Sequence, residues 1–66
     1  MSYKAEVDVE VIRTTELALL VTEGETEEWV PKSVLDDEGD INDASSVGDE
    51  GTMILPQKMA EEKGFV

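Results

Sequence analysis

Nine consecutive residues near the N-terminus, from Tyr3 to Val11, alternate strictly between apolar and polar side chains. The odd positions hold one tyrosine, one alanine and three valines, and the even positions hold one lysine and three acids. A period of two residues places the two sets on opposite faces of an extended chain, and valine favours strands. The segment therefore predicts a half-buried β-strand, and the chain is expected to fold around a sheet with one covered face.

Two further strands are expected on either side of a glycine-containing turn. Residues 17–22 form a short apolar run, and residues 27–31 carry the single tryptophan, Trp29, which we expect to point inward. Residues 23–26 between them include a glycine, as a hairpin connection does. Pro31 cannot donate a ladder hydrogen bond, so it should end the second of these strands or lie at a sheet edge.

The second half of the chain divides into an acidic loop, a strand and a helix. Residues 36–51 hold seven acids, three glycines and no base, which predicts a flexible loop with at most a short strand around Ile41. Residues 32–35 before it suit one helical or 3-10 turn. Strand character returns at residues 52–55. Residues 56–63 predict a helix, because a proline opens the segment and a glycine follows it.

Together these elements predict one domain over residues 1–66, of the α+β class and mainly β. We expect a bent antiparallel sheet of three to four strands, or a small open barrel, with one C-terminal helix. Exposed sheet edges could pair two copies, so a monomer or a homodimer is expected. The predicted core consists of Tyr3, Val7, Val9, Val11, Leu17, Leu19, Val21, Trp29, Val34, Ile54, Met59 and Phe65.

Two residue types that carry much of protein chemistry are missing. The chain has no cysteine and no histidine, so it lacks thiolate and imidazole ligands and the usual acid or base at neutral pH. At 66 residues it is also too short to enclose a catalytic pocket and retain a core. We therefore expect a protein that is not an enzyme and uses no cofactor. The N-terminal residues have no apolar signal-peptide core, and a cytoplasmic location is expected.

The acidic loop invites a calcium-binding interpretation that its spacing does not support. With the EF-hand template started at Asp36, the sixth position holds Ile41 and the twelfth holds Val47, where the template requires glycine and glutamate. A solvated acidic loop is the favoured interpretation, and a weak cation site is the alternative. No metal ligand is predicted.

The charge balance indicates a basic partner. Seventeen acids against five bases give a net charge of −12, beyond the magnitude of about 2–8 that suits a small soluble domain. Nucleic acids and membrane surfaces are themselves anionic, so direct binding to either is disfavoured.

The first predicted strand holds three of these acids in a row, about 6.8 Å apart on one face. This row is either the solvated face of a sheet or a surface whose negative potential is its function. On the second interpretation, the partner is a basic protein surface. The predicted partner-binding residues are Glu6, Asp8, Glu10, Glu25, Glu27, Glu28, Asp36, Asp37, Glu38, Asp40, Asp43, Asp49 and Glu50.

Short motifs in the second half of the chain carry a family resemblance. The sequence Trp29-Val30-Pro31-Lys32-Ser33 is followed, after the acidic loop, by Ile54-Leu55-Pro56 and by Met59-Ala60-Glu61-Glu62-Lys63-Gly64-Phe65. Over residues 15–66 this layout resembles small, largely uncharacterised proteins of phages and other mobile elements. That family has a tryptophan in the helix where this chain has Gln57-Lys58-Met59, so a shared aromatic surface there is not implied.

In size, charge and lack of catalytic residues the chain is similar to small acidic phage proteins of the anti-CRISPR and anti-restriction type. Those proteins mimic the phosphate backbone and occupy DNA-binding channels. The similarity implies a phage-encoded inhibitor that blocks a basic DNA- or RNA-binding groove of a host defence protein in a prokaryotic cell. The alternative is a structural or assembly accessory of a virion or mobile element that acts through protein–protein contacts.

Overall fold

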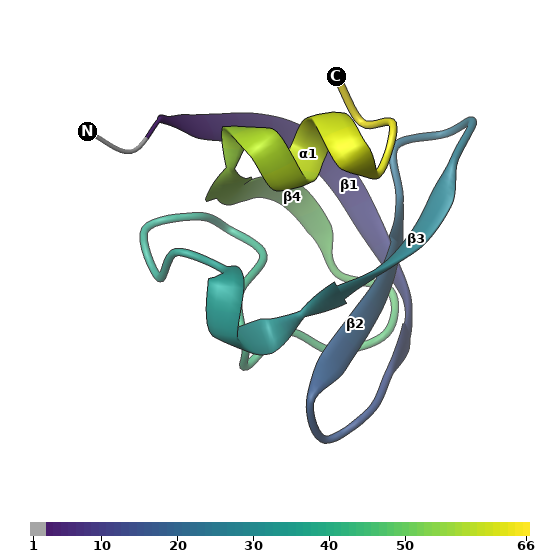
Figure 1. Cartoon of the computed structure of the whole chain (residues 1–66). Coiled ribbons are helices and arrows are strands. Elements are labelled where there is room, and N and C mark those ends of the chain that lie inside the picture. Colours follow the sequence, from purple (N-terminus) through teal and green to yellow (C-terminus); the bar gives the residue numbers. More distant parts are fainter. Residues whose placement is uncertain (1–2) are drawn as a thin grey trace.

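Four antiparallel strands form a strongly bent sheet, and one short helix packs against its end (Figure 1). The computed structural model describes residues 3–66. The strand order is β3-β2-β1-β4, so β1 and β2 are central and the sheet is open, as β3 and β4 are not paired with each other. The predicted fold class is confirmed. The elements are β1 (Lys4–Thr14), β2 (Ala18–Thr22), β3 (Glu27–Pro31), the 3-10 turn η1 (Lys32–Val34), β4 (Glu50–Pro56) and α1 (Gln57–Glu62).

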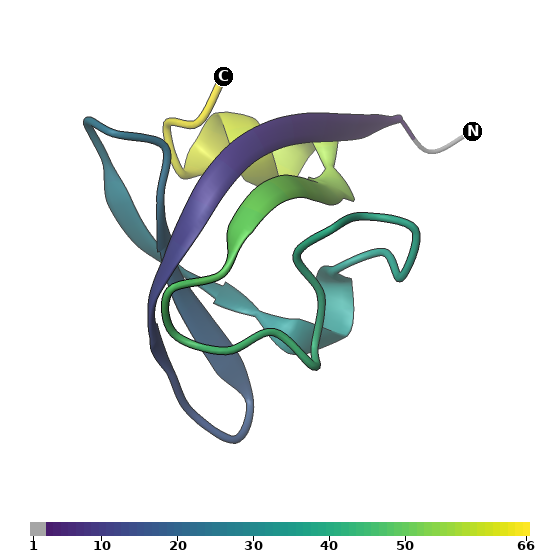
Figure 2. The same cartoon turned by 180° about the vertical axis from the view of Figure 1, so that it is seen from behind.

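Strand β1 has 11 residues and pairs with both β2 and β4, and it curves along its whole length (Figure 2). Its alternation works as predicted, because the alanine and valines at positions 5 to 11 are buried and the acids between them are exposed. The pairing with β2 shifts between Val11 and Arg13. Ile12 is the extra residue of this β-bulge, and a bulge bends a strand and increases its twist.

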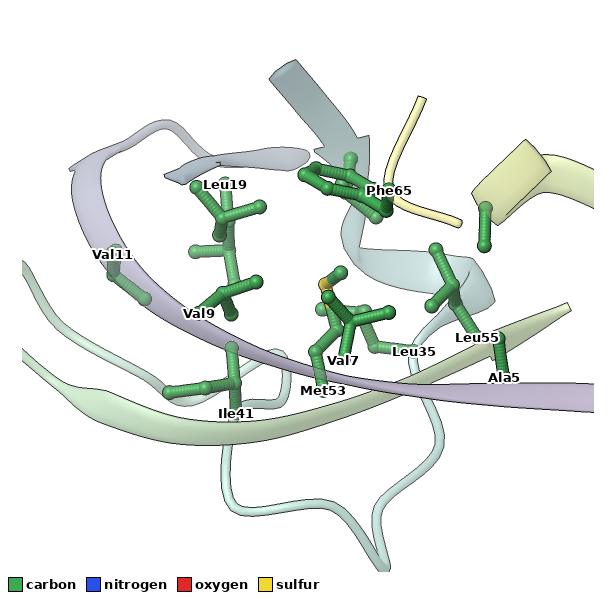
Figure 3. Close-up of a cluster of buried hydrophobic side chains, with 13 residues drawn as sticks. Ala5, Val7, Val9, Val11, Leu19, Leu35, Ile41, Met53, Leu55 and Phe65 are labelled. Carbon is green, nitrogen blue, oxygen red and sulfur yellow. The ribbon is translucent and has the colours of Figure 1, made fainter. Parts of the chain in front are cut away.

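The core lies on the concave side of the sheet, where side chains from the strands, the acidic loop and the C-terminus meet (Figure 3). Six members of the predicted core are buried: Val7, Val9, Val11, Leu19, Val21 and Phe65. Val34 and Met59 are partly buried and pack against them. The core also contains seven residues that the sequence prediction had not placed there: Ala5, Val30, Leu35, Ile41, Met53, Leu55 and Ala60.

Four predicted core residues lie outside the core. Tyr3 and Leu17 are 72% and 77% exposed, because the first precedes β1 and the second lies in the connection between β1 and β2. Trp29 is 44% exposed, and Ile54 is only half-buried. The prediction of an inward Trp29 is therefore wrong.

The strand register explains the position of Trp29. Leu19 pairs with Val30, and both are fully buried. The next pair, Leu20 with Trp29, must then face the opposite side, because successive side chains alternate. Ile54 is displaced in the same way, between two buried residues of β4.

The acidic segment between η1 and β4 is held along the outer edge of β4. The backbone N–H of Asp36 donates to the carbonyl of Ile54 at 2.9 Å, and that of Ile41 donates to Thr52 at 3.0 Å. Ile41 forms a single parallel bridge with Met53, which confirms the short extended stretch expected there, and its side chain is fully buried. These bonds occupy two carbonyl groups on the outer edge of β4 within the chain itself.

Helix α1 begins one residue later than predicted, since Pro56 still has extended backbone (φ −57°, ψ 135°) as the last residue of β4. It ends at Glu62, one residue before the predicted end, and the expected glycine follows its C-cap, Lys63. Gly64 takes a left-handed φ of 82°, while its N–H donates to Glu61 and the N–H of Phe65 donates to Ala60, at 3.2 and 2.9 Å. This Schellman pattern turns the buried Phe65 ring back onto the core.

Candidate protein-binding surface

The row of acids on β1 lies on the face of the sheet opposite the core. Glu6, Asp8 and Glu10 are all exposed, and each stands between two buried residues of the same strand. Burial of those neighbours fixes the backbone of the row, so the strand itself needs little ordering on binding. The hydroxyl of Thr52, directly across on β4, donates to Asp8 Oδ1 at 2.8 Å and orients that side chain further.

Two more acids extend this row across the sheet. Glu10 pairs directly with Glu50 on β4, and on its other side it pairs with Thr22, which in turn pairs with Glu27 on β3. Like charges directly opposite each other in a sheet are destabilising. The acidic face is defined here as the outward carboxylates of β1, β3 and β4: Glu6, Asp8, Glu10, Glu27 and Glu50.

A shallow open hollow of about 310 Å³ lies next to this face. Asp8, Glu10, Glu23 and Glu50 are among the residues that line it, together with Gly24 and Gly51. Its lining brings β1 and β4 together with the turn between β2 and β3, which are far apart in the sequence. The arrangement suits a cationic side chain that enters from solvent.

The other predicted acids do not join the acidic face. Glu25 is exposed in the hairpin turn, and Glu28 is half-buried on the core side of β3, opposite Val21. Asp37, Glu38 and Asp43 are exposed in the loop between η1 and β4.

Three loop acids are engaged by the backbone or by a base. Asp40 Oδ2 accepts from the N–H of Thr52 at 3.1 Å, and Asp49 Oδ2 accepts from the N–H of Ser46 at 2.8 Å. Asp36 accepts from Lys4 Nζ, the one ion pair within residues 3–66. These three side chains hold the loop in place and are therefore less available to a partner.

The pKa of the Asp36 carboxyl is held below its ordinary value, first by the hydrogen bond from Lys4 and next by the one from the backbone N–H of Glu38. A carboxyl whose folded-state pKa is depressed stabilises the fold above its unfolded-state pKa, about 3.9. That contribution is lost as the pH falls through the lower, folded-state value.

Asp36→Asn should therefore lower the melting temperature at about pH 7, and the difference between the two chains should shrink as the pH is lowered into the acid range through the folded-state pKa of Asp36. Asparagine can still accept the Glu38 N–H, so the difference isolates the ion pair with Lys4. Thermal unfolding followed by circular dichroism over this pH range measures it. A difference between the two chains that is independent of pH would contradict the assignment.

Screening of the acidic face should stabilise the folded chain. Because the net charge is −12 and like charges face each other on the sheet, we expect the melting temperature to rise with salt. A gain of about 1 kcal/mol between about 0.05 and 0.5 M NaCl corresponds to about 4–8 °C in a domain of this size. The double variant Glu10→Gln, Glu50→Gln should show a smaller rise. A melting temperature that falls with salt would contradict this expectation.

Trp29 is the surface residue that sequence reasoning missed. It lies on the same outward face as the acids, paired across the strands with Leu20, which pairs in turn with Arg13. Because the two apolar residues of β3 are adjacent, period-two reasoning alone could not decide which of them points inward.

Comparison with known protein families, characterised proteins and solved structures gave no match to this chain. Among residues 3–66, no group of three or more acids has the geometry to hold a metal ion. The same part of the chain contains no helix that is long and apolar enough to cross a membrane.

Proposed function

We propose that this chain is an acidic inhibitor that mimics nucleic acid and blocks a basic DNA- or RNA-binding groove of a host defence protein, as phage-encoded anti-CRISPR and anti-restriction proteins do. The observation that carries the proposal is the acidic face itself, with Glu10 directly opposite Glu50 on adjacent strands. Such a pair costs stability. A sheet selected for stability alone would have lysine at some of these positions.

The spacing of the charges supports the same proposal. The row on β1 has one carboxylate per about 6.8 Å, about half the density of a single DNA strand, which has one charge per about 3.4 Å. Glu50 and Glu27 on the neighbouring strands add charge beside the row. Carboxylates of this density on rigid strands would steer a basic groove toward the face and compete with a nucleic acid for it.

The experiment that tests this function is an affinity capture from lysates of bacteria that carry defence systems, with the immobilised chain as bait. The captured protein should bind DNA or RNA, and it should be released when NaCl is raised from about 0.1 to about 0.5 M. The matched bait carries Glu6→Lys, Asp8→Lys and Glu10→Lys and should capture none of it. Capture that survives high salt and is equal for the two baits would contradict the proposal and would favour the structural or assembly accessory.

A further inference from the structure

Trp29 forms the centre of an apolar patch on the outward face of the sheet. Its side chain is 44% exposed although it is the largest apolar side chain in the chain. Leu20 lies directly opposite it on β2, and Pro31 lies two residues further along β3 on the same face. Both neighbours are half-buried, so the exposed Trp29 has apolar residues beside it on the same face of the sheet.

This patch is continuous with the acidic face. Glu27 precedes Trp29 by two residues on the same face of β3, which places the two Cα atoms about 6.8 Å apart. Across the strands, Glu27 pairs with Thr22 and Thr22 pairs with Glu10. This line of cross-strand pairs lies next to the line in which Trp29 pairs with Leu20. The only basic residue in these two lines of cross-strand pairs is Arg13 on β1, and Leu20 lies between it and Trp29.

We propose that Trp29 and Glu27 together receive an arginine side chain of the basic partner, so that the surface selects arginine over lysine. This inference rests on the proposed function, whose partner surface it specifies. The guanidinium group stacks on an indole face, and its N–H groups reach a carboxylate beside the ring at the same time. An ammonium group has no plane to stack and gains only the charge interaction. Exposed tryptophans of this kind are also the residues that most often dominate the binding energy of protein interfaces.

The acidic face beside the patch is complementary in charge to a cationic partner and disfavours other partners. A nucleic acid base could also stack on an exposed indole, but the surrounding carboxylates and the net charge of −12 repel the phosphates that such a base carries. A second copy of this chain would be repelled in the same way.

The test uses two labelled homopeptides of equal length and charge, one of arginine and one of lysine. Their affinities for the whole chain are measured by fluorescence anisotropy at about 0.1 M NaCl. The arginine peptide is expected to bind about tenfold more tightly than the lysine peptide. In Trp29→Ala the affinity for the arginine peptide should fall toward that for the lysine peptide, which should change little. The matched control, Val47→Ala, truncates an exposed apolar residue in the acidic loop and should alter neither affinity.

A second readout needs no variant. Since Trp29 is the only tryptophan, its fluorescence reports on this patch alone, and saturation with the arginine peptide should quench or shift it more than saturation with the lysine peptide. Equal affinities for the two peptides, or equal emission changes, would overturn the inference. The two peptides could bind equally well while the triple variant Glu6→Lys, Asp8→Lys, Glu10→Lys still lowers the affinity for both. The acidic face would then bind cationic partners without a contribution from Trp29. If the triple variant weakens neither peptide, the failure belongs to the proposed function.

Discussion

Reversing Glu6, Asp8 and Glu10 together to lysine is expected to reduce affinity for the captured partner by at least about a hundredfold. The three side chains are exposed on one rigid strand. The change therefore places three positive charges against the lysine and arginine side chains of the partner. Like charges brought together at an interface cost several kcal/mol. The fold should persist, because the buried residues of β1 are unchanged. Isothermal titration calorimetry measures the loss, and a melting curve checks the fold.

The matched control for this triple variant reverses Glu16, Glu61 and Glu62, which are exposed outside the acidic face. Each reversal adds two charge units, so both variants have a net charge of −6 in place of −12. The control should bind within about threefold of the unaltered chain. An equal loss in the two variants would show that net charge alone drives binding and that the row on β1 has no special part. The isosteric variant Glu6→Gln, Asp8→Asn, Glu10→Gln separates lost attraction from added repulsion.

Truncating Ile41 to alanine is expected to bring the whole domain close to unfolding. The side chain is fully buried, and Ile41 forms the β-bridge that joins the acidic loop to Met53 of β4. Deleting a buried isoleucine side chain to alanine costs about 2–5 kcal/mol. A domain of 66 residues has a total stability of only about 3–10 kcal/mol. Urea denaturation followed by circular dichroism should therefore show a large shift of the midpoint.

Val47→Ala is the control, since this residue lies in the same loop but is 62% exposed. Its unfolding free energy should change by less than about 0.5 kcal/mol. If Ile41→Ala were as mild as Val47→Ala, the loop would not be part of the core, and the edge of β4 would be open to other chains.

The sequence predicted the fold well where a pattern was long enough to define a face. The nine alternating residues of β1 determine their own orientation, and the turn, the helix end and the hairpin follow from glycine and proline chemistry. Short apolar runs carry no such information. Trp29 and Val30 are adjacent, and so are Met53, Ile54 and Leu55, so either parity fits. The register with a neighbouring strand decides which residue is buried, and that is a non-local property.

The candidate site shows the same division. The acids of β1 were placed correctly on one exposed face because they share the alternation of that strand. In the acidic loop, the prediction rested on composition alone, and every acid was therefore predicted to bind the partner. The structure separates them, since Asp36, Asp40 and Asp49 bond to Lys4, Thr52 and Ser46, whereas Asp37 and Asp43 point to solvent. The contacts of Asp36 and Asp40 span 32 and 12 residues, so no local signal could have revealed them.

The meeting of Glu10 with Glu50 depends on the β1–β4 register and could not be foreseen either. That pair gives the acidic face a cost in stability that a merely solvated face would have no reason to retain. The central claim is therefore that the carboxylates of this face occupy the position of a nucleic acid backbone in the partner.

Competition between this chain and double-stranded DNA for the captured partner tests that claim most directly. The partner is saturated with labelled DNA, the chain is added, and the bound DNA is followed by anisotropy together with the mass of the complexes. We predict mutually exclusive binding, with DNA released in proportion to the added chain and no release by the variant Glu6→Lys, Asp8→Lys, Glu10→Lys. A stable complex that holds the chain, the partner and the DNA at once, with neither affinity changed, would contradict the claim.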